Sequence, residues 1–494
     1  MIALIESIAK RRTHSGLRAW IAEARALTRL AAPLVFTQLG QMVIMTTDVL
    51  LLGRFSRIAL AAAAIGNTVF YFTWLMGAGP AAAVSPMVAH IVGENPDNRR
   101  GVRAALRMGM WAAGLVAAPM MVLLWFGGEI LLALHQDPVL AAAAGQFLRI
   151  LAFDLPFSLA YLVLRNFTTA LGKPRAGLWV MGATIFINAA LGYTLIFGHF
   201  GAPRLGIVGS GLATTLSAVF SFLAMAVYVQ AAPAMRVYRA FRRFARPVGV
   251  KLAEVFRLGV PMGLTMTFEA MLFNAATLLM GTFGATALAA HQIALNVASV
   301  TFMVPLGVGM AATVRVGLAS GAGDPDAARR AGLVAMMIGV GFVALCGVVM
   351  ALAGAPIAGL YLGGRAEADL KVIAMAAIFL KLAAAFQVFD ALQVVNAQSL
   401  RGLKDVRMPM VLAGASYWLI GAPVCLFLGM GLNMQGLGVW IGLSISLAAA
   451  AVMLGARFFW LTRGEGRQPG AEPALDAGGA RDGPYVGATP KISG

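Results

Sequence analysis

Long apolar runs recur along the whole chain, separated by short polar or basic connections. A helix that crosses a hydrocarbon core about 30 Å thick needs about 20 consecutive, mostly apolar residues. Twelve stretches of the sequence meet this requirement and predict an all-α polytopic membrane protein. They cover residues 30–53, 60–91, 103–126, 139–165, 176–197, 206–230, 255–282, 286–318, 330–354, 368–399, 409–431 and 436–461.

The composition supports the same class. Hydrophobic residues make up 60% of the chain and charged residues 12%, and the mean hydropathy is +0.82. So little polar surface cannot cover a soluble core of this size. Cys346 and Cys425 both fall in apolar runs and offer no spacing for a metal site or a disulfide framework. We therefore expect no cofactor.

The formal net charge of +18 is concentrated in alternate connections. Examples are Arg99, Arg100 and Arg103 after the second predicted helix, Lys173 and Arg175 after the fourth, Arg236 and Arg239 after the sixth, and Arg401, Lys404 and Arg407 after the tenth. By the positive-inside rule, both termini face the cytoplasm. We interpret the charge as a topology signal and expect the partners to be the lipid bilayer and small molecules, with no nucleic acid.

The two halves of the sequence repeat one another. RLAAPLVFTQL from Arg29 matches RLGVPMGLTMT from Arg257, and GENPDNRR from Gly93 matches GAGDPDAARR from Gly321. A repeat that contains six helices returns the chain to the same side, so the halves have parallel topology. This predicts two six-helix lobes related by a pseudo-twofold axis along the membrane normal, with a cavity between them.

The sequence divides accordingly into five segments. We expect a basic cytoplasmic arm (1–29), an N-terminal lobe (30–230), a cytoplasmic linker (231–254), a C-terminal lobe (255–461) and a disordered cytoplasmic tail (462–494). The tail is rich in Gly, Pro and Ala and cannot bury enough apolar surface to order itself.

Three acids lie inside predicted membrane helices: Asp48, Glu269 and Asp390. A carboxylate near the bilayer centre costs about 2.5 to 3.5 kcal/mol, so an acid at such a position indicates a functional role. Burial favours the neutral form of a carboxylic acid, and a second carboxylate nearby favours it further. These are the properties that a proton carrier needs.

Several segments resemble the multidrug and toxic compound extrusion (MATE) family, in particular its NorM-type members. They are AAPLVFTQLGQMVIMTTDVLLLG, FRLGVPMGLTMTFEAMLFN, AAHQIALN and FDALQVVNAQSLRGLKD, and the likeness extends over 25–461. The resemblance implies a monomeric twelve-helix antiporter of the bacterial inner membrane. Such a protein exports bulky, often cationic drugs in exchange for H⁺ or Na⁺. It also implies that Asp48, Glu269 and Asp390 are the coupling acids and that Asn188 assists Asp48.

Two positions depart from the NorM pattern. Phe386 stands where tyrosine is frequent, and Gly192 stands where a second amide is expected one turn after Asn188. Both changes remove polar groups that could replace the water shell of Na⁺. The sequence thus favours H⁺ over Na⁺, although Na⁺ could still bind at Glu269 and Asp390 with help from Gln387 or backbone carbonyls.

Other polar groups in the predicted helices have open roles. Asp154 could pair with Arg149, and Lys381 is the repeat partner of Arg149. Gln292 and Asn296 could line the cavity, as could the aromatic ring of Phe386. We interpret His291 as a hydrogen-bonded polar residue, because no other His or Cys stands at ligand spacing.

Two other functions fit the sequence less well. A flippase for lipid-linked oligosaccharides would need Arg and Lys in the cavity to hold pyrophosphate, whereas acids predominate among the candidate residues here. An intramembrane enzyme is disfavoured because the sequence carries no zinc-ligand or GxSxG motif. We therefore expect a transporter and no enzymatic activity.

Overall fold

The computed structural model describes residues 16–241, 248–362 and 367–463. Residues 1–15 of the expected arm and 464–494 of the expected tail lie outside the described residues.

Within the described ranges, twelve helices are long and apolar enough to cross a membrane. Eleven are α2 (Leu17–Phe55), α3 (Arg57–Glu94), α4 (Arg99–Trp125), α6 (Pro138–Ala170), α7 (Arg175–Phe197), α8 (Ile207–Ala231), α10 (Gly249–Thr282), α11 (Ala285–Gly321), α12 (Pro325–Leu352), α14 (Glu367–Gly402) and α17 (Gln435–Thr462). The remaining span is built from α15 (Arg407–Gly414), η2 (Ala415–Gly421), α16 (Ala422–Leu426) and η3 (Phe427–Gly431). Short helices α5 (Gly127–Ala133), α9 (Pro233–Arg236) and α13 (Gly354–Gly359) lie in connections. The predicted fold class is confirmed.

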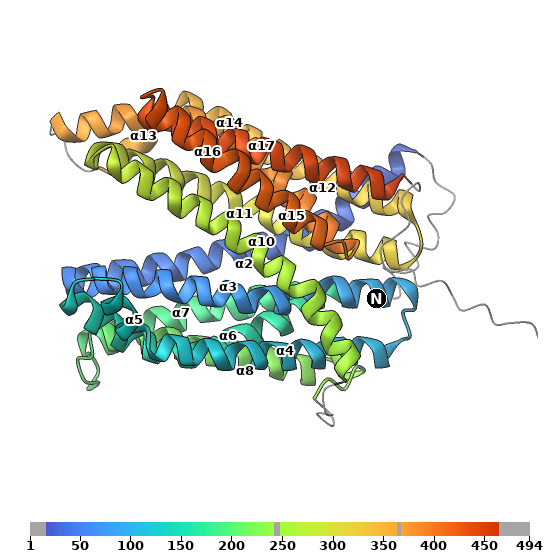
Figure 1. The fold of residues 1–494 in the computed structure, drawn as a ribbon. Coiled ribbons are helices and arrows are strands. Elements are labelled where there is room, and N and C mark those ends of the chain that lie inside the picture. Colours follow the sequence, from blue (N-terminus) through green and yellow to red (C-terminus); the bar gives the residue numbers. More distant parts are fainter. Residues whose placement is uncertain (1–15, 242–247, 363–366, 464–494) are drawn as a thin grey trace, which may run out of the picture.

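The six-helix halves form two lobes (Figure 1). We call the end with the α3–α4, α6–α7, α11–α12 and α14–α15 connections the basic end, after Arg99, Lys173, Arg329 and Arg407. The end that holds α5 and α13 is the far end. The lobes diverge toward the far end (Figure 1).

The packing explains this shape. The largest buried apolar cluster contains residues of both lobes, such as Leu27 and Val84 from one and Val314 and Leu400 from the other. A second cluster belongs to the C-terminal lobe alone, and a third belongs to the N-terminal lobe alone. The lobes therefore share a core near the basic end and keep separate cores near the far end.

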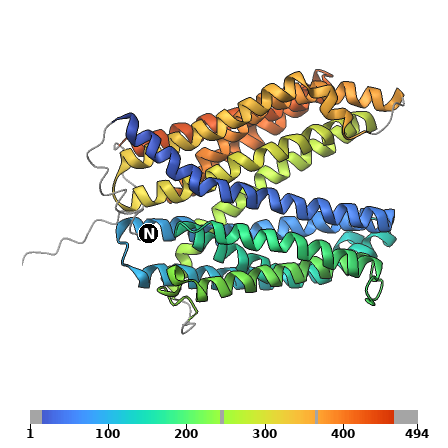
Figure 2. The ribbon, with the colours of Figure 1, turned by 180° about the vertical axis from the view of Figure 1, so that it is seen from behind.

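The first helix of each half crosses over to the opposite lobe. α2 packs against α11 and α12 as well as against α7 in its own lobe, while α10 packs against α3 and α4. Figure 2 shows α2 starting beside the C-terminal lobe and running diagonally along the N-terminal one. The exchange is reciprocal, as a twofold relation requires.

Close contacts between α3 and α11 display the predicted symmetry. A Cβ atom on Gly93 would lie 2.2 Å from the carbonyl oxygen of Leu318, and a Cβ atom on Gly321 would lie 2.2 Å from that of His90. Each residue of one contact is 228 positions from its counterpart in the other. Glycine is needed at both positions because the backbones approach too closely for a side chain.

A buried ion pair joins the lobes near the basic end. Nε of Arg315 in α11 donates to Glu23 in α2 at 2.7 Å, and its Nη2 donates to the second carboxylate oxygen at 2.5 Å. Their side chains are only 6% and 5% exposed. Glu23 belongs to the segment that we expected to be a separate arm. Residues 17–29 instead form the first turns of α2.

Candidate functional site

Two of the predicted acids lie together in the C-terminal lobe. Glu269 is on α10 and Asp390 is on α14, and the charge of Glu269 acts directly on Asp390. Asp390 is buried at 6% exposure, whereas Glu269 is half-buried. Among the described residues, neither carboxylate takes part in an ion pair. The positive charge of Arg401, farther along α14, acts on Glu269 without forming an ion pair with it.

Glu269 faces the other lobe just beyond the point where the lobes touch. The backbones of α3 and α10 meet at Gly79, Gly259 and Gly263, where a Cβ on Gly79 would lie 2.3 Å from the Gly259 oxygen. Glu269 follows Gly263 by six residues, or about 9 Å of helix toward the far end. Tyr71 of α3 lies within electrostatic range of Glu269. The Glu269 carboxyl group can therefore meet a ligand between the lobes.

Tyr417 is a member of this site that the sequence analysis missed. The side chain is fully buried, its hydroxyl group has no hydrogen-bond partner, and it interacts electrostatically with Glu269 and Asp390. It lies in the π-helical turn η2, a type of turn that occurs often at functional sites. Pro423 has no N–H to donate to the preceding turn, which favours such a widened turn. A tyrosine six residues before a proline in an apolar span was the available signal.

The third acid lies in a separate site in the N-terminal lobe. Oγ1 of Thr214 on α8 donates to Oδ2 of Asp48 on α2 at 3.4 Å. Asn188 on α7 interacts with the same carboxylate, but neither atom of its buried amide forms a hydrogen bond of normal geometry. Asp48 and Asn188 therefore come together as the resemblance implied, and Thr214 is an addition. Polar atoms of this kind, buried without partners, can accommodate a proton or a cation.

Gln387 and Phe386 both lie inside the C-terminal lobe. The side-chain oxygen of Gln387 accepts a hydrogen bond from Thr301 at 2.8 Å, and its amide donates to the carbonyl oxygen of Val343 at 2.9 Å. Gln387 thus links α14 to α11 and α12 in this structure. Phe386 packs edge-on against Phe273 and Trp440. Its ring belongs to the apolar core of the lobe.

Gln292 and Asn296 are exposed on α11, and Asn296 accepts a hydrogen bond from Tyr361 at 2.9 Å. His291 is fully buried, lies 3.3 Å from the Thr277 hydroxyl group and packs edge-on against Trp440. This agrees with its interpretation as a structural polar residue. No group of three or more His, Cys, Asp or Glu side chains that could hold a metal occurs within the described ranges.

The possible pairing of Arg149 with Asp154 does not form. Arg149 instead forms an ion pair at 2.9 Å with Glu129 of α5, and both side chains are about half exposed. Five residues of helix place Arg149 and Asp154 on different faces, which explains the difference. Asp154 is buried at 3% exposure and interacts with Ser158 one turn later. Lys381 is exposed on α14.

Two six-helix lobes of parallel topology, with carboxyl groups inside each lobe, are the architecture of a membrane transporter. The MatE family model matches residues 33–194 and 261–427, and the chain belongs to this family. The resemblance found in the sequence is thereby confirmed.

Relatives and solved structures agree with this assignment. A protein from Mesorhizobium japonicum described as a probable multidrug resistance protein NorM is 43% identical over 445 residues, or 90% of this chain and 95% of the relative. The eukaryotic MATE transporter AtDTX14 has a TM-score of 0.80 at 24% identity and covers 89% of this chain and 96% of its own. An outward-facing multidrug resistance MATE transporter has a TM-score of 0.81 at 18% identity, over 92% of this chain and 99% of its own. These structural likenesses establish the fold.

Proposed function

We propose that this chain is a multidrug efflux antiporter. It exports bulky, often cationic organic compounds by alternating access, in exchange for a cation that is H⁺ rather than Na⁺. The observation that carries the proposal is the position of Glu269 at the surface between the lobes, with Asp390 buried behind it and no ion-pair partner for either acid in the described part of the chain. Its relatives are described as probable multidrug resistance proteins, which supports drugs as the substrates.

Competition between drug and proton provides the coupling. Charged Glu269 and Asp390 attract a cationic drug, and protonation of these carboxyl groups removes the attraction. Each ligand shifts the equilibrium between lobe arrangements only by its difference in affinity for them. Drug entering from one side and protons from the other therefore drive exchange. A lipid-linked oligosaccharide flippase would need cationic groups at the position that Glu269 and Tyr71 occupy.

The orientation follows from the positive-inside rule. Arginines and lysines of the basic end face the cytoplasm, so both ends of the described chain lie on that side of a bacterial inner membrane. The shared core and the Glu23–Arg315 pair then close the cytoplasmic side. This arrangement corresponds to the state that releases drug to the outside.

Substitution of the two acids tests the coupling site. Glu269→Gln and Asp390→Asn should each abolish gradient-driven drug efflux from proteoliposomes while leaving expression intact, because each removes a titratable group with little change of shape. Glu367→Gln is the matched control, since Glu367 pairs with Lys371 at an exposed position. Transport at the wild-type rate in both acid variants would refute the assignment.

The coupling ion is tested by imposing one gradient at a time. An inward pH gradient without sodium should drive efflux, and a sodium gradient added at fixed pH should give little further increase. Phe386 and Gly192 lack the polar groups that a Na⁺ site would use, whereas proton transfer needs only the carboxyl groups. Full transport on sodium alone, with none on the pH gradient, would show that Na⁺ is the coupling ion.

A further inference from the structure

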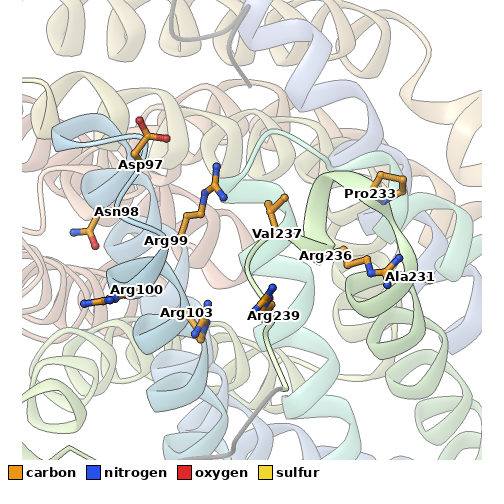
Figure 3. A pocket seen from close by; sticks show the side chains of 10 residues that line it. All are labelled: Asp97, Asn98, Arg99, Arg100, Arg103, Ala231, Pro233, Arg236, Val237 and Arg239. Carbon is orange, nitrogen blue, oxygen red and sulfur yellow. The ribbon is translucent and has the colours of Figure 1, made fainter.

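A pocket lined by arginines opens at the basic end of the N-terminal lobe (Figure 3). Its volume is about 800 Å³. It lies between the start of α4 and the segment that follows α8. The lining residues are Asp97, Asn98, Arg99, Arg100, Arg103, Ala231, Pro233, Arg236, Val237 and Arg239. Five arginines and a single aspartate give this pocket a strongly positive potential.

The walls of the pocket are held in place by specific contacts. Nε of Arg103 donates to the carbonyl oxygen of Tyr238 at 2.6 Å, and Nε of Arg107 donates to that of Ala240 at 3.4 Å. Tyr238 is fully buried and packs edge-on against Phe167 of α6, with ring centroids 5.9 Å apart. These contacts fix the segment after α8 on the lobe. The backbone that carries Arg236 and Arg239 is therefore held in one position.

The polar groups of the pocket suit a phosphate. A guanidinium group offers parallel N–H donors that match two phosphate oxygens. Several arginines together can replace the water around a phosphate with charged hydrogen bonds. Figure 3 shows Arg99 and Arg103 extending from α4 toward Val237 and Arg239 on the opposite wall. The N-terminus of α4 adds the positive end of the dipole of a 27-residue helix. Arg239 has a left-handed backbone (φ 46°), which is uncommon for a residue with a side chain.

An apolar path leads from the membrane surface to this pocket. Leu223 and Val227 on α8 are 52% and 62% exposed, and Ala231 in the pocket wall follows Val227 by one helical turn. Val237, also in the wall, is 42% exposed. A ligand with a phosphate group and an acyl chain would satisfy both features, whereas a soluble phosphate would use only the arginines.

We propose that this pocket binds the phosphate head group of an anionic phospholipid, with an acyl chain of that lipid lying along Leu223 and Val227 of α8. Basic pockets at the cytoplasmic ends of membrane helices recognise anionic head groups through this combination of charge and depth. The pocket belongs to the N-terminal lobe, whereas Glu269 and Asp390 belong to the C-terminal lobe, and lipid binding does not depend on the coupling ion. The bound lipid would anchor the α4 and α8 ends of the N-terminal lobe at the membrane surface.

Lipid titration of the purified full-length protein tests this site. Binding of dioleoyl phosphatidylglycerol and of dioleoyl phosphatidylcholine is measured by native mass spectrometry for the wild type and for the variant Arg99→Gln/Arg236→Gln/Arg239→Gln. The wild type should prefer phosphatidylglycerol, and the variant should lose roughly 100-fold of that affinity, because each of the three basic residues near an anionic surface contributes about fivefold. Arg103 is left in place because it holds the backbone of Tyr238.

The matched control is Lys173→Gln/Arg175→Gln/Arg407→Gln, which removes three exposed positive charges from the basic end outside the pocket. It should keep wild-type phosphatidylglycerol binding, and thermal unfolding confirms that both variants fold. Equal affinity of the pocket variant and the wild type for phosphatidylglycerol would overturn the proposal. Wild-type binding of glycerol phosphate as tight as that of phosphatidylglycerol would identify a soluble phosphate as the ligand and would also overturn it.

Discussion

Glu23→Gln should open the basic end of the protein without unfolding either lobe. The carboxylate of Glu23 in α2 receives two hydrogen bonds from Arg315 in α11, at 2.7 and 2.5 Å. These two residues belong to different lobes, so the pair contributes to the arrangement of the lobes more than to the core of either one. Removing one partner leaves the Arg315 guanidinium group buried with a neutral amide in place of its counter-ion.

The magnitude follows from burial. Both side chains are 6% exposed or less, and removing one member of a buried pair costs about 3–5 kcal/mol. An amide still accepts a hydrogen bond, so we expect about 3 kcal/mol, or roughly 100-fold in the equilibrium between closed and open basic ends. Glu129→Gln is the matched control, because Glu129 also pairs with an arginine, Arg149, at 2.9 Å, but this pair is about half exposed and lies within one lobe. Such a pair contributes about 0–1 kcal/mol.

Distance measurements between spin labels would detect the change. One label pair at Lys173 and Asp326 spans the basic end and another at Gln136 and Leu360 spans the far end, all at exposed positions, in a background without the two native cysteines. Glu23→Gln should lengthen the first distance and shorten the second. The exchange Glu23→Arg/Arg315→Glu should restore the wild-type distributions in part. Unchanged distributions in Glu23→Gln would refute the reasoning that this pair holds the lobes together.

Two further predictions concern the contact between the lobes and the C-terminal site. Gly259→Ala should destabilise the closed basic end by about 1–3 kcal/mol, because the added Cβ atom would lie 2.3 Å from the Cα atom of Pro80. Gly281→Ala is the control, because its Cβ atom would meet nothing within 4 Å. It should keep the wild-type distances between the spin labels and the wild-type thermal stability. Tyr417→Phe should leave thermal stability nearly unchanged, because it removes a buried hydroxyl group that has no partner. The same variant should shift the external pH that gives half-maximal drug efflux, and an unchanged pH profile would exclude Tyr417 from the coupling site.

Much of the fold follows from local sequence patterns. Apolar runs of membrane-spanning length predicted twelve helices because each run satisfies its own backbone in a bilayer, whatever its neighbours are. The repeat between Gly93 and Gly321 predicted the symmetry because these glycines mark one contact on both sides of the axis. The sequence did not predict that α2 begins at Leu17, because hydropathy detects only the apolar span. Residues 17–29 are polar on one side, and their helix is stabilised by contacts with the C-terminal lobe.

The site residues divide in a similar way. Asp48, Glu269 and Asp390 were predictable because acids are conspicuous in apolar helices. Tyr417 was missed because an aromatic residue counts as apolar, and only the packed lobe shows that its hydroxyl group lies without a partner near the acids. The pairing of Arg149 could not be deduced because α5, which carries Glu129, is too short to stand out from the connection that contains it.

The crossing of α2 onto the opposite lobe has a consequence for synthesis of the protein in the cell. Glu23 and Arg315 are separated by 292 positions in the chain, so at about 5–20 residues per second a ribosome needs roughly 15–60 s to supply the partner of the first helix. During this interval the first turns of α2, including Leu27, lack the surface against which they are packed in the finished molecule. The N-terminal lobe is thus inserted first, but the start of α2 reaches its final packing only after α11 has been made. An assembly factor that shields the start of α2 would have its greatest effect before α11 enters the membrane.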